Sequence, residues 1–228
     1  MHPGKSKIRY LALLLQCLLL APVGVQAQHT VATVGYEQTF PGSEPEHYTI
    51  SVGADCRASY QSDGKVTEQS AGDESYHYDF TVTPPNCSRI FDLAKRARYF
   101  DGAIDSKRKN IAATGTKILS YKDAQRNAKA TYNYSPLPEV QDLTALFQDM
   151  SATMEFGRRL EYDHRYQKLA LDEDLRRMDE SAGRSGLQEI PAISPVLQKI
   201  VDDPSLMNVI RARAQRMLAA SKSGVTGK

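Results

Sequence analysis

The chain has 228 residues, with 29 basic and 27 acidic side chains and a formal charge of +2 at pH 7. Charges of both signs are interspersed, so the sequence lacks the polybasic stripe that binds nucleic acid and the cationic cluster that binds anionic lipid. We therefore expect no nucleic-acid partner. No stretch after the first 27 residues is long and apolar enough to span a bilayer, so we expect no stable membrane insertion of the mature chain.

Residues 1–27 have the pattern of a signal peptide. A basic start over residues 5–9 precedes an apolar run over residues 10–22, and a small-residue motif ends at Ala27. The run is shorter than the roughly 20 residues of a membrane span, which favours cleavage after Ala27 over an uncleaved anchor. Cleavage removes three basic residues and no acidic residue, so the formal charge falls from +2 to −1. We predict an exported protein, either periplasmic or extracellular.

Two cysteines, Cys56 and Cys87, remain after cleavage. An exported protein meets an oxidising compartment, so the simplest prediction is a disulfide between them that closes a loop of about 32 residues. The alternative is a redox-active pair, but the adjacent CxxC arrangement that tunes such thiols is absent.

Residues 28–45, which are rich in proline and glycine near their end, are predicted to form a flexible lead-in to an α+β domain over residues 46–160. From Tyr48 the apolar and polar residues alternate, which is the pattern of a half-buried strand. A second strand follows, and the Asp-Gly pair within residues 62–65 predicts a hairpin turn with a return strand over residues 65–69.

The segment "ESYHYDFTVT" over residues 74–83 places aromatic residues at every second position and Ser75, His77 and Asp79 on the opposite face. Same-face neighbours on a strand lie about 6.8 Å apart, whereas members of a hydrolase triad need hydrogen-bond distances near ~3 Å. We therefore predict a solvent-exposed strand face here and no triad. These three residues are candidates for a binding surface.

The rest of the domain follows from changes of periodicity. A helix is predicted after Pro85, with Asn86 or Ser88 as its cap, and two further strands over residues 116–122 and 128–134. From Pro138 a broad apolar stripe with helical spacing predicts a helix that lies across the sheet. The expected fold is therefore α+β, an antiparallel meander of about five strands with two helices on one face.

Residues 161–222 are predicted to form a helical C-terminal region, followed by a disordered tail over residues 223–228. Its first helix is highly charged, and Glu161 with Arg165 has the four-residue spacing of a helical ion pair. The last helix has a clean apolar face, which makes a homodimer through that helix possible.

Signals for catalysis are weak. Glu161 and His164 make half of the carboxylate–histidine pattern of di-iron bundles, and no second copy exists. The sequence has no serine-hydrolase elbow, phosphate loop, dinucleotide fingerprint or HExxH motif. We therefore expect no metal and no cofactor.

Four segments carry a resemblance to a family of uncharacterised exported bacterial domains. They are the helix "NCSRIFDLAKRARYF", the strand pair around "TKILSYKD" and "ATYNYS", and the helix "EVQDLTALFQDMSATMEFGRRL". The resemblance covers about residues 47–160 and implies a small sheet with a covering helix. That family has no assigned activity or catalytic residues, so the resemblance implies no function.

The sequence favours a non-enzymatic binding protein of the bacterial cell envelope, whose partner is another envelope protein. Its expected surfaces are the polar strand face and the charged helix, with Glu161, His164 and Arg165 as further candidates for binding. The alternative is a secreted hydrolase that combines His77 or His164 with a carboxylate from a distant segment.

Overall fold

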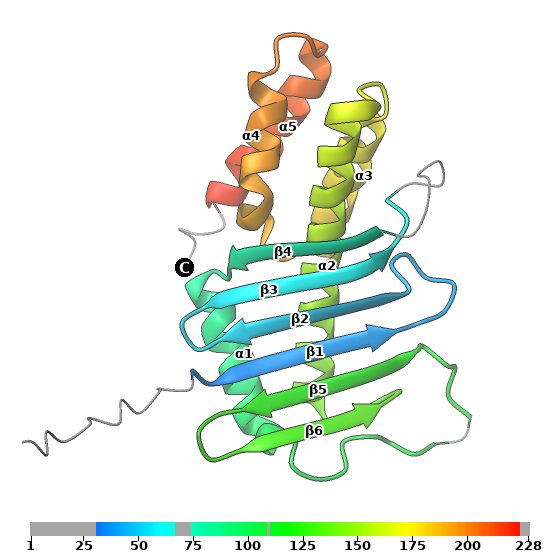
Figure 1. The fold of residues 1–228 in the computed structure, drawn as a ribbon, viewed down its shortest axis with the longest axis vertical. Coiled ribbons are helices and arrows are strands. Elements are labelled where there is room, and N and C mark those ends of the chain that lie inside the picture. The colour runs from blue at the N-terminus through cyan, green and yellow to red at the C-terminus, as the bar shows by residue number, and fades with distance from the viewer. Residues whose placement is uncertain (1–30, 67–73, 109, 224–228) are drawn as a thin grey trace, which may run out of the picture.

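The computed structural model describes residues 31–66, 74–108 and 110–223, which form an α+β fold with an antiparallel sheet (Figure 1). The expected signal peptide, the first three residues of the lead-in and nearly all of the expected disordered tail lie outside the described residues.

The sheet has six strands, one more than expected, in the order β4-β3-β2-β1-β5-β6, and every neighbouring pair is antiparallel. The first four strands form an antiparallel meander, and β5 then pairs with the free edge of β1. The strands are β1 (Thr33–Thr39), β2 (His47–Gly53), β3 (Arg57–Gly64), β4 (Glu74–Thr81), β5 (Thr116–Lys122) and β6 (Asn127–Tyr132).

Strand β1 corrects the prediction of a flexible lead-in. It lies inside the sheet between β2 and β5, and its Val34 and Tyr36 are buried in the core. The period-two alternation that identifies a strand is present here. The prediction was wrong because the turn residues that follow, Pro41 to Pro45, indicate a loop, and the whole segment was assigned with them.

The predicted hairpin turn at residues 62–65 is also wrong. Ser62, Asp63 and Gly64 continue β3 and pair with the first residues of β4. Burial explains this, because Ser62 faces the core and forms a hydrogen bond there, so tertiary contacts override the turn preference of Asp-Gly. Of the expected return strand, residues 65 and 66 lie outside any strand and residues 67–69 lie outside the described residues.

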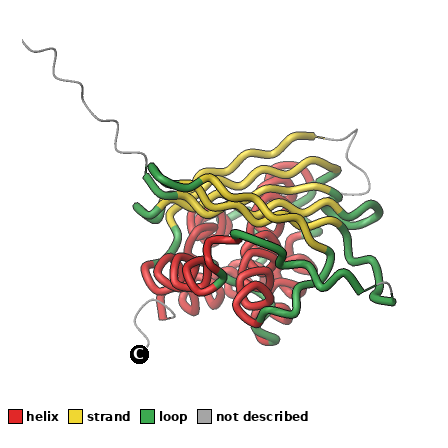
Figure 2. Tube along the Cα trace, turned by 90° about the horizontal axis from the view of Figure 1, so that it is seen from below, coloured by secondary structure: helices red, strands yellow, loops and turns green. Residues whose placement is uncertain are grey.

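The helices gather against one face of the sheet, and none of the helices that the structure describes lies over the opposite face (Figure 2). Helices α1 and α2 cover the core, as expected. The helices are α1 (Pro84–Arg96), α2 (Pro138–Tyr166), α3 (Leu171–Gly183), α4 (Ser194–Asp202) and α5 (Asn208–Ser223), with short 3-10 turns η1 (Arg98–Phe100) and η2 (Ile190–Ile193).

Helix α2 runs continuously through the expected domain boundary at residue 160. It has 29 residues, so its first part lies on the sheet and its last turns project beyond the sheet into the helical region (Figure 1). Gly157 permits a close contact at this junction, because a Cβ there would lie 2.6 Å from Ile193 Cγ2 of η2. Helices α3 and α4 then pack against α2, and α5 packs against α3 and α4.

The sequence analysis considered the apolar face of α5 as a homodimer contact. In the structure, most of this face is buried inside the helical region of the same chain. Ile210, Ala214, Met217 and Leu218 are all buried within the chain itself. Within the described part of the chain, no helix combines the length and apolar character needed to cross a bilayer.

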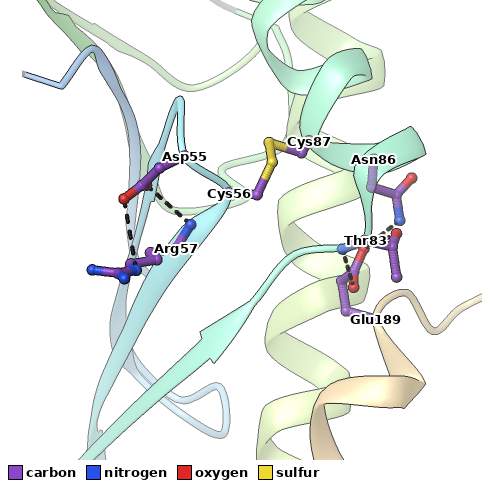
Figure 3. The surroundings of a disulfide bond; sticks show 7 residues. All are labelled: Asp55, Cys56, Arg57, Thr83, Asn86, Cys87 and Glu189. Atoms are coloured by element: carbon purple, nitrogen blue, oxygen red, sulfur yellow. Dashed lines mark hydrogen bonds and ion pairs between the residues drawn. A yellow bond between two sulfur atoms is a disulfide. The ribbon is translucent and has the colours of Figure 1, made fainter.

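The predicted disulfide between Cys56 and Cys87 is present and joins the β2–β3 connection to the first turn of α1 (Figure 3). Neither Asn86 nor Ser88, the two expected caps, forms a side-chain capping bond at the N-terminus of α1. The carboxylate of Glu189 accepts hydrogen bonds from the Thr83 backbone N–H (2.9 Å), the Thr83 hydroxyl (2.7 Å) and the Asn86 amide (2.7 Å). A carboxylate at this helix N-terminus is favourable for the helix dipole.

Removal of the disulfide should lower stability without changing the fold. The bridge spans 31 positions, so its loss should cost about 3–4 kcal/mol in the chain-entropy model. We expect the double variant Cys56→Ala with Cys87→Ala to show a lower urea midpoint and an unchanged far-ultraviolet circular dichroism spectrum. The parent protein under reducing conditions is the matched control and should unfold at the same midpoint as the variant.

Candidate functional site

A row of tyrosines crosses four strands on the inner face of the sheet. Tyr36, Tyr48, Tyr60 and Tyr76 come from β1 to β4 in turn, and successive ring centroids lie 5.9, 6.0 and 6.2 Å apart. The first three are buried and Tyr76, nearest the sheet edge, is partly exposed. Buried tyrosine hydroxyls need hydrogen-bond partners, so this row requires polar groups on the helix that covers it.

Helix α2 supplies those polar groups at three- and four-residue spacing. Glu155 Oε1 accepts hydrogen bonds from the Tyr60 hydroxyl at 2.7 Å and the Ser62 hydroxyl at 2.6 Å. Ser151 Oγ lies 3.1 Å from the same tyrosine hydroxyl. Burial, together with the Glu155 charge, raises the pKa of Tyr60 far above its ordinary value, so this hydroxyl stays a donor.

One turn further along α2, Arg158 is fixed to the backbone of two strands. Its Nη2 donates to the carbonyl oxygens of Gly64 in β3 and Glu74 in β4, both at 2.9 Å. Its guanidinium carbon lies 5.3 Å from the centroid of the Tyr76 ring. The side chain is 5 % exposed, and its Nη1 lies 3.7 Å from the Glu155 carboxylate. The strand ends and the helix are therefore held at a fixed separation.

A cleft of about 410 Å³ opens beside Arg158, between the C-terminal half of α2 and the start of the edge strand β4. We call it the Tyr/Arg cleft. Its lining residues are Val66, Glu74, Ser75, Tyr76, Arg158, Glu161, Tyr162, Arg165 and Tyr166. The Tyr162 and Tyr166 rings pack 5.0 Å apart, and the Arg165 guanidinium lies 5.8 Å from the centroid of Tyr166.

Three of the six predicted binding residues meet in the Tyr/Arg cleft. Ser75 comes from β4, and Glu161 and Arg165 come from α2, 86 or more positions later in the sequence. The predicted ion pair between Glu161 and Arg165 does not form; Glu161 instead pairs with Lys199 of α4 at 3.1 Å. His77, Asp79 and His164 do not line this cleft.

On the outer face of the sheet, Ser75, His77 and Asp79 do not form a triad. The Ser75 hydroxyl donates to Asp63 on β3 at 2.7 Å and makes no bond to His77. His77 Nε2 does lie 3.1 Å from Asp79 Oδ1, although the backbone spacing argument predicts that same-face neighbours stay apart. Side-chain length accounts for the difference, since both side chains lean along the strand. Both are more than half exposed, so the pair lies in water.

His164 lies on a different side of α2 from the cleft residues. Its Nε2 is 3.0 Å from Asp203 Oδ2, and Lys168 Nζ lies 2.8 Å from the same oxygen. Hydrogen bonds from Lys168 and Ser205 hold the pKa of Asp203 well below its usual range, so the carboxylate stays charged. Asp203 and Ser205 also form a turn, which is why α5 begins at Asn208.

The cleft residues that the sequence analysis missed are Val66, Glu74, Tyr76, Arg158, Tyr162 and Tyr166. The alternation along β4 assigns Tyr76 to the core, and nothing local distinguishes Arg158 from a surface arginine. A usable signal exists in α2, where Ser151, Glu155 and Arg158 recur at helical spacing beside the apolar stripe of the helix. Polar residues in that pattern indicate a buried polar seam.

Comparison with known families finds no family model that matches the chain, and no curated protein matches it. Among the described residues, no three histidine, cysteine, aspartate or glutamate side chains gather as a metal site requires. The assignment of function therefore depends on the geometry of this chain.

A second buried polar feature lies between α2 and α3. Asp163 and Asp174 are 1 % and 8 % exposed, and they share a hydrogen bond. Burial, together with the hydrogen bond and the charge of Asp174, raises the pKa of Asp163 to about 7, and the charge of Arg159 opposes the shift. Two carboxyl groups this close in a buried site retain one proton.

The Asp163 carboxyl should make stability depend on pH. The folded protein holds a proton that the unfolded chain releases near pH 4, so stability should fall as pH rises from about 4 to about 7. We expect Asp163→Asn to raise the free energy of unfolding at pH 8 by about 1–3 kcal/mol and to change it little at pH 4.5. Urea unfolding at both pH values measures this.

Asp179→Asn is the matched control, because Asp179 is an exposed acid on α3. It should leave the pH profile unchanged. A profile for Asp163→Asn that runs parallel to the parent profile would contradict the shared-proton interpretation.

Proposed function

We propose that the protein is an exported, non-enzymatic binding protein whose partner contacts the Tyr/Arg cleft. The observation that carries the proposal is the composition of that cleft, where three tyrosines and two arginines share one concave surface. Tyrosine and arginine are enriched among the residues that dominate binding energy, because each combines a large contact area with hydrogen-bond donors.

The ordered walls of the cleft support a binding role. Arg158 is anchored to Gly64 and Glu74 before any partner arrives, and Tyr76 packs against its guanidinium. A surface that is already ordered loses little conformational entropy on binding. The exposed side chains of Glu161 and Arg165 offer both charges at the rim, which suits a polar partner surface with complementary charges.

The positions of the histidines favour binding over the hydrolase alternative. Each has a carboxylate within 3.1 Å, but His77 lies on the open sheet face and His164 is tied to Asp203 and Lys168. Neither lies in the cleft, and the Ser75 hydroxyl is bound to Asp63. The candidate nucleophile that lines the concave site, Ser75, is thus bound to a carboxylate, and neither candidate histidine base lies in that site.

The disulfide is consistent with export, because such bonds persist in oxidising compartments. The partner that we propose is another envelope protein. Besides the Tyr/Arg cleft, we propose two further surfaces for contact with this partner. One is the outer face of the sheet with His77 and Asp79, and the other is the charged helix α3.

Charge reversal in the cleft should abolish partner binding. We expect Arg165→Glu to lower the recovery of an envelope partner, cross-linked through a photoreactive residue at Tyr162, by about tenfold, since a rim charge then repels instead of attracting. Quantitative mass spectrometry of the cross-linked material measures this.

Arg96→Glu is the matched control, because Arg96 is an exposed arginine on α1, outside the cleft and outside the other two proposed surfaces. It should leave cross-linking intact. Equal recovery of the same partner with both variants would show that the cleft is not the contact surface, and the absence of any cross-linked partner would leave the proposal without its central support.

A further inference from the structure

Exposed apolar side chains concentrate at one end of the molecule. In the described part of the chain, seven large hydrophobic residues are exposed, and four of them lie in two loops or at the helix ends beside those loops. They are Tyr166 (63 % exposed), Leu169 (87 %), Met207 (54 %) and Val209 (51 %). We call these four residues the apolar tip.

The two loops of the apolar tip are joined by direct contacts. Lys168 Nζ, in the α2–α3 loop, lies 2.8 Å from Asp203 Oδ2 and 2.6 Å from Ser205 Oγ, both in the α4–α5 loop. His164 adds a bond to the same carboxylate. Both loops lie at the end of the molecule opposite β6, at the top of Figure 1. The tip is therefore formed by two loops that are braced against each other.

The charges around the apolar tip are mixed and slightly basic. Arg165, Lys168 and Arg211 lie on the same turns as the apolar residues, against Asp202 and Asp203. Lys168 neutralises Asp203 directly, and Arg211 uses its Nε to bind the Val201 carbonyl at 2.8 Å. Because these residues come from two separate loops, the sequence alone shows no cationic cluster.

The size of the apolar tip decides among possible partners. Four partly exposed side chains offer on the order of 500 Å² of apolar surface, less than the roughly 800 Å² per partner of a stable protein interface. A bilayer surface does not impose this requirement, because each apolar side chain enters the interface independently and nearby cations meet anionic headgroups.

We propose that the apolar tip docks the protein on the surface of a membrane that contains anionic lipid. Leu169 and Met207 enter the headgroup region, while Arg165 and Lys168 lie at the level of the lipid phosphates. The protein would remain peripheral, since the tip is made of loops and helix ends. Docking would orient α2 toward the membrane and place the sheet away from it.

Vesicle sedimentation tests this proposal with the chain from Gln28 onward, which contains every described residue. We expect sedimentation with phosphatidylcholine vesicles that contain about 30 % phosphatidylglycerol, and weaker binding to phosphatidylcholine alone. The double variant Leu169→Glu with Met207→Glu should reduce the partition coefficient at least about tenfold. Neither residue lines the Tyr/Arg cleft, so its partner binding should be unchanged.

Val31→Glu is the matched control, because Val31 is 47 % exposed at the start of the chain that the structure describes and is remote from the tip. It should bind vesicles like the parent protein. Equal binding by the double variant, or no binding of the parent protein to either vesicle, would overturn the proposal. So would a concentration-dependent dimer that the double variant abolishes, because the tip would then contact a second copy.

Discussion

The hydrogen bonds of Glu155 fix the position of α2 on the sheet. This carboxylate accepts bonds from Tyr60 and Ser62 and lies beside Arg158, which in turn holds the ends of β3 and β4. Apolar contacts alone would let a long helix slide or rotate, whereas a buried carboxylate must meet its donors at one register. The cleft and the orientation of the helical region both depend on that register, since α2 contributes to both.

Much of the fold follows from periodicity, and the exceptions have physical causes. The alternation in β2 and β4 and the apolar stripe of α2 are strong enough to predict those elements from the sequence. Strand β1 is missed because its local pattern is short and adjoins a turn-rich segment, and only its pairing with both β2 and β5 makes it central. The preference of Asp63-Gly64 for a turn is overridden in the same way, by pairing with β4.

The candidate site is predictable only in part. Ser75, Glu161 and Arg165 are chosen from the sequence for their chemistry, and the fold brings them to one cleft. The sequence could not predict the cleft itself. One wall of the cleft depends on Arg158, whose side chain binds backbone carbonyls 84 and 94 positions away in the sequence. Contacts of this range leave no local pattern in the sequence.

The bond between Glu189 and the first turn of α1 has a consequence for the order of folding. Thr83 and Asn86 leave the ribosome more than 100 residues before the carboxylate that caps them. During synthesis, the bonds that Thr83 and Asn86 make to Glu189 can therefore form only after the start of η2 has been made. The C-terminal helices are for this reason an integral part of the folding unit, and a chain that ends near residue 160 would lack both the cap and the neighbours of Gly157.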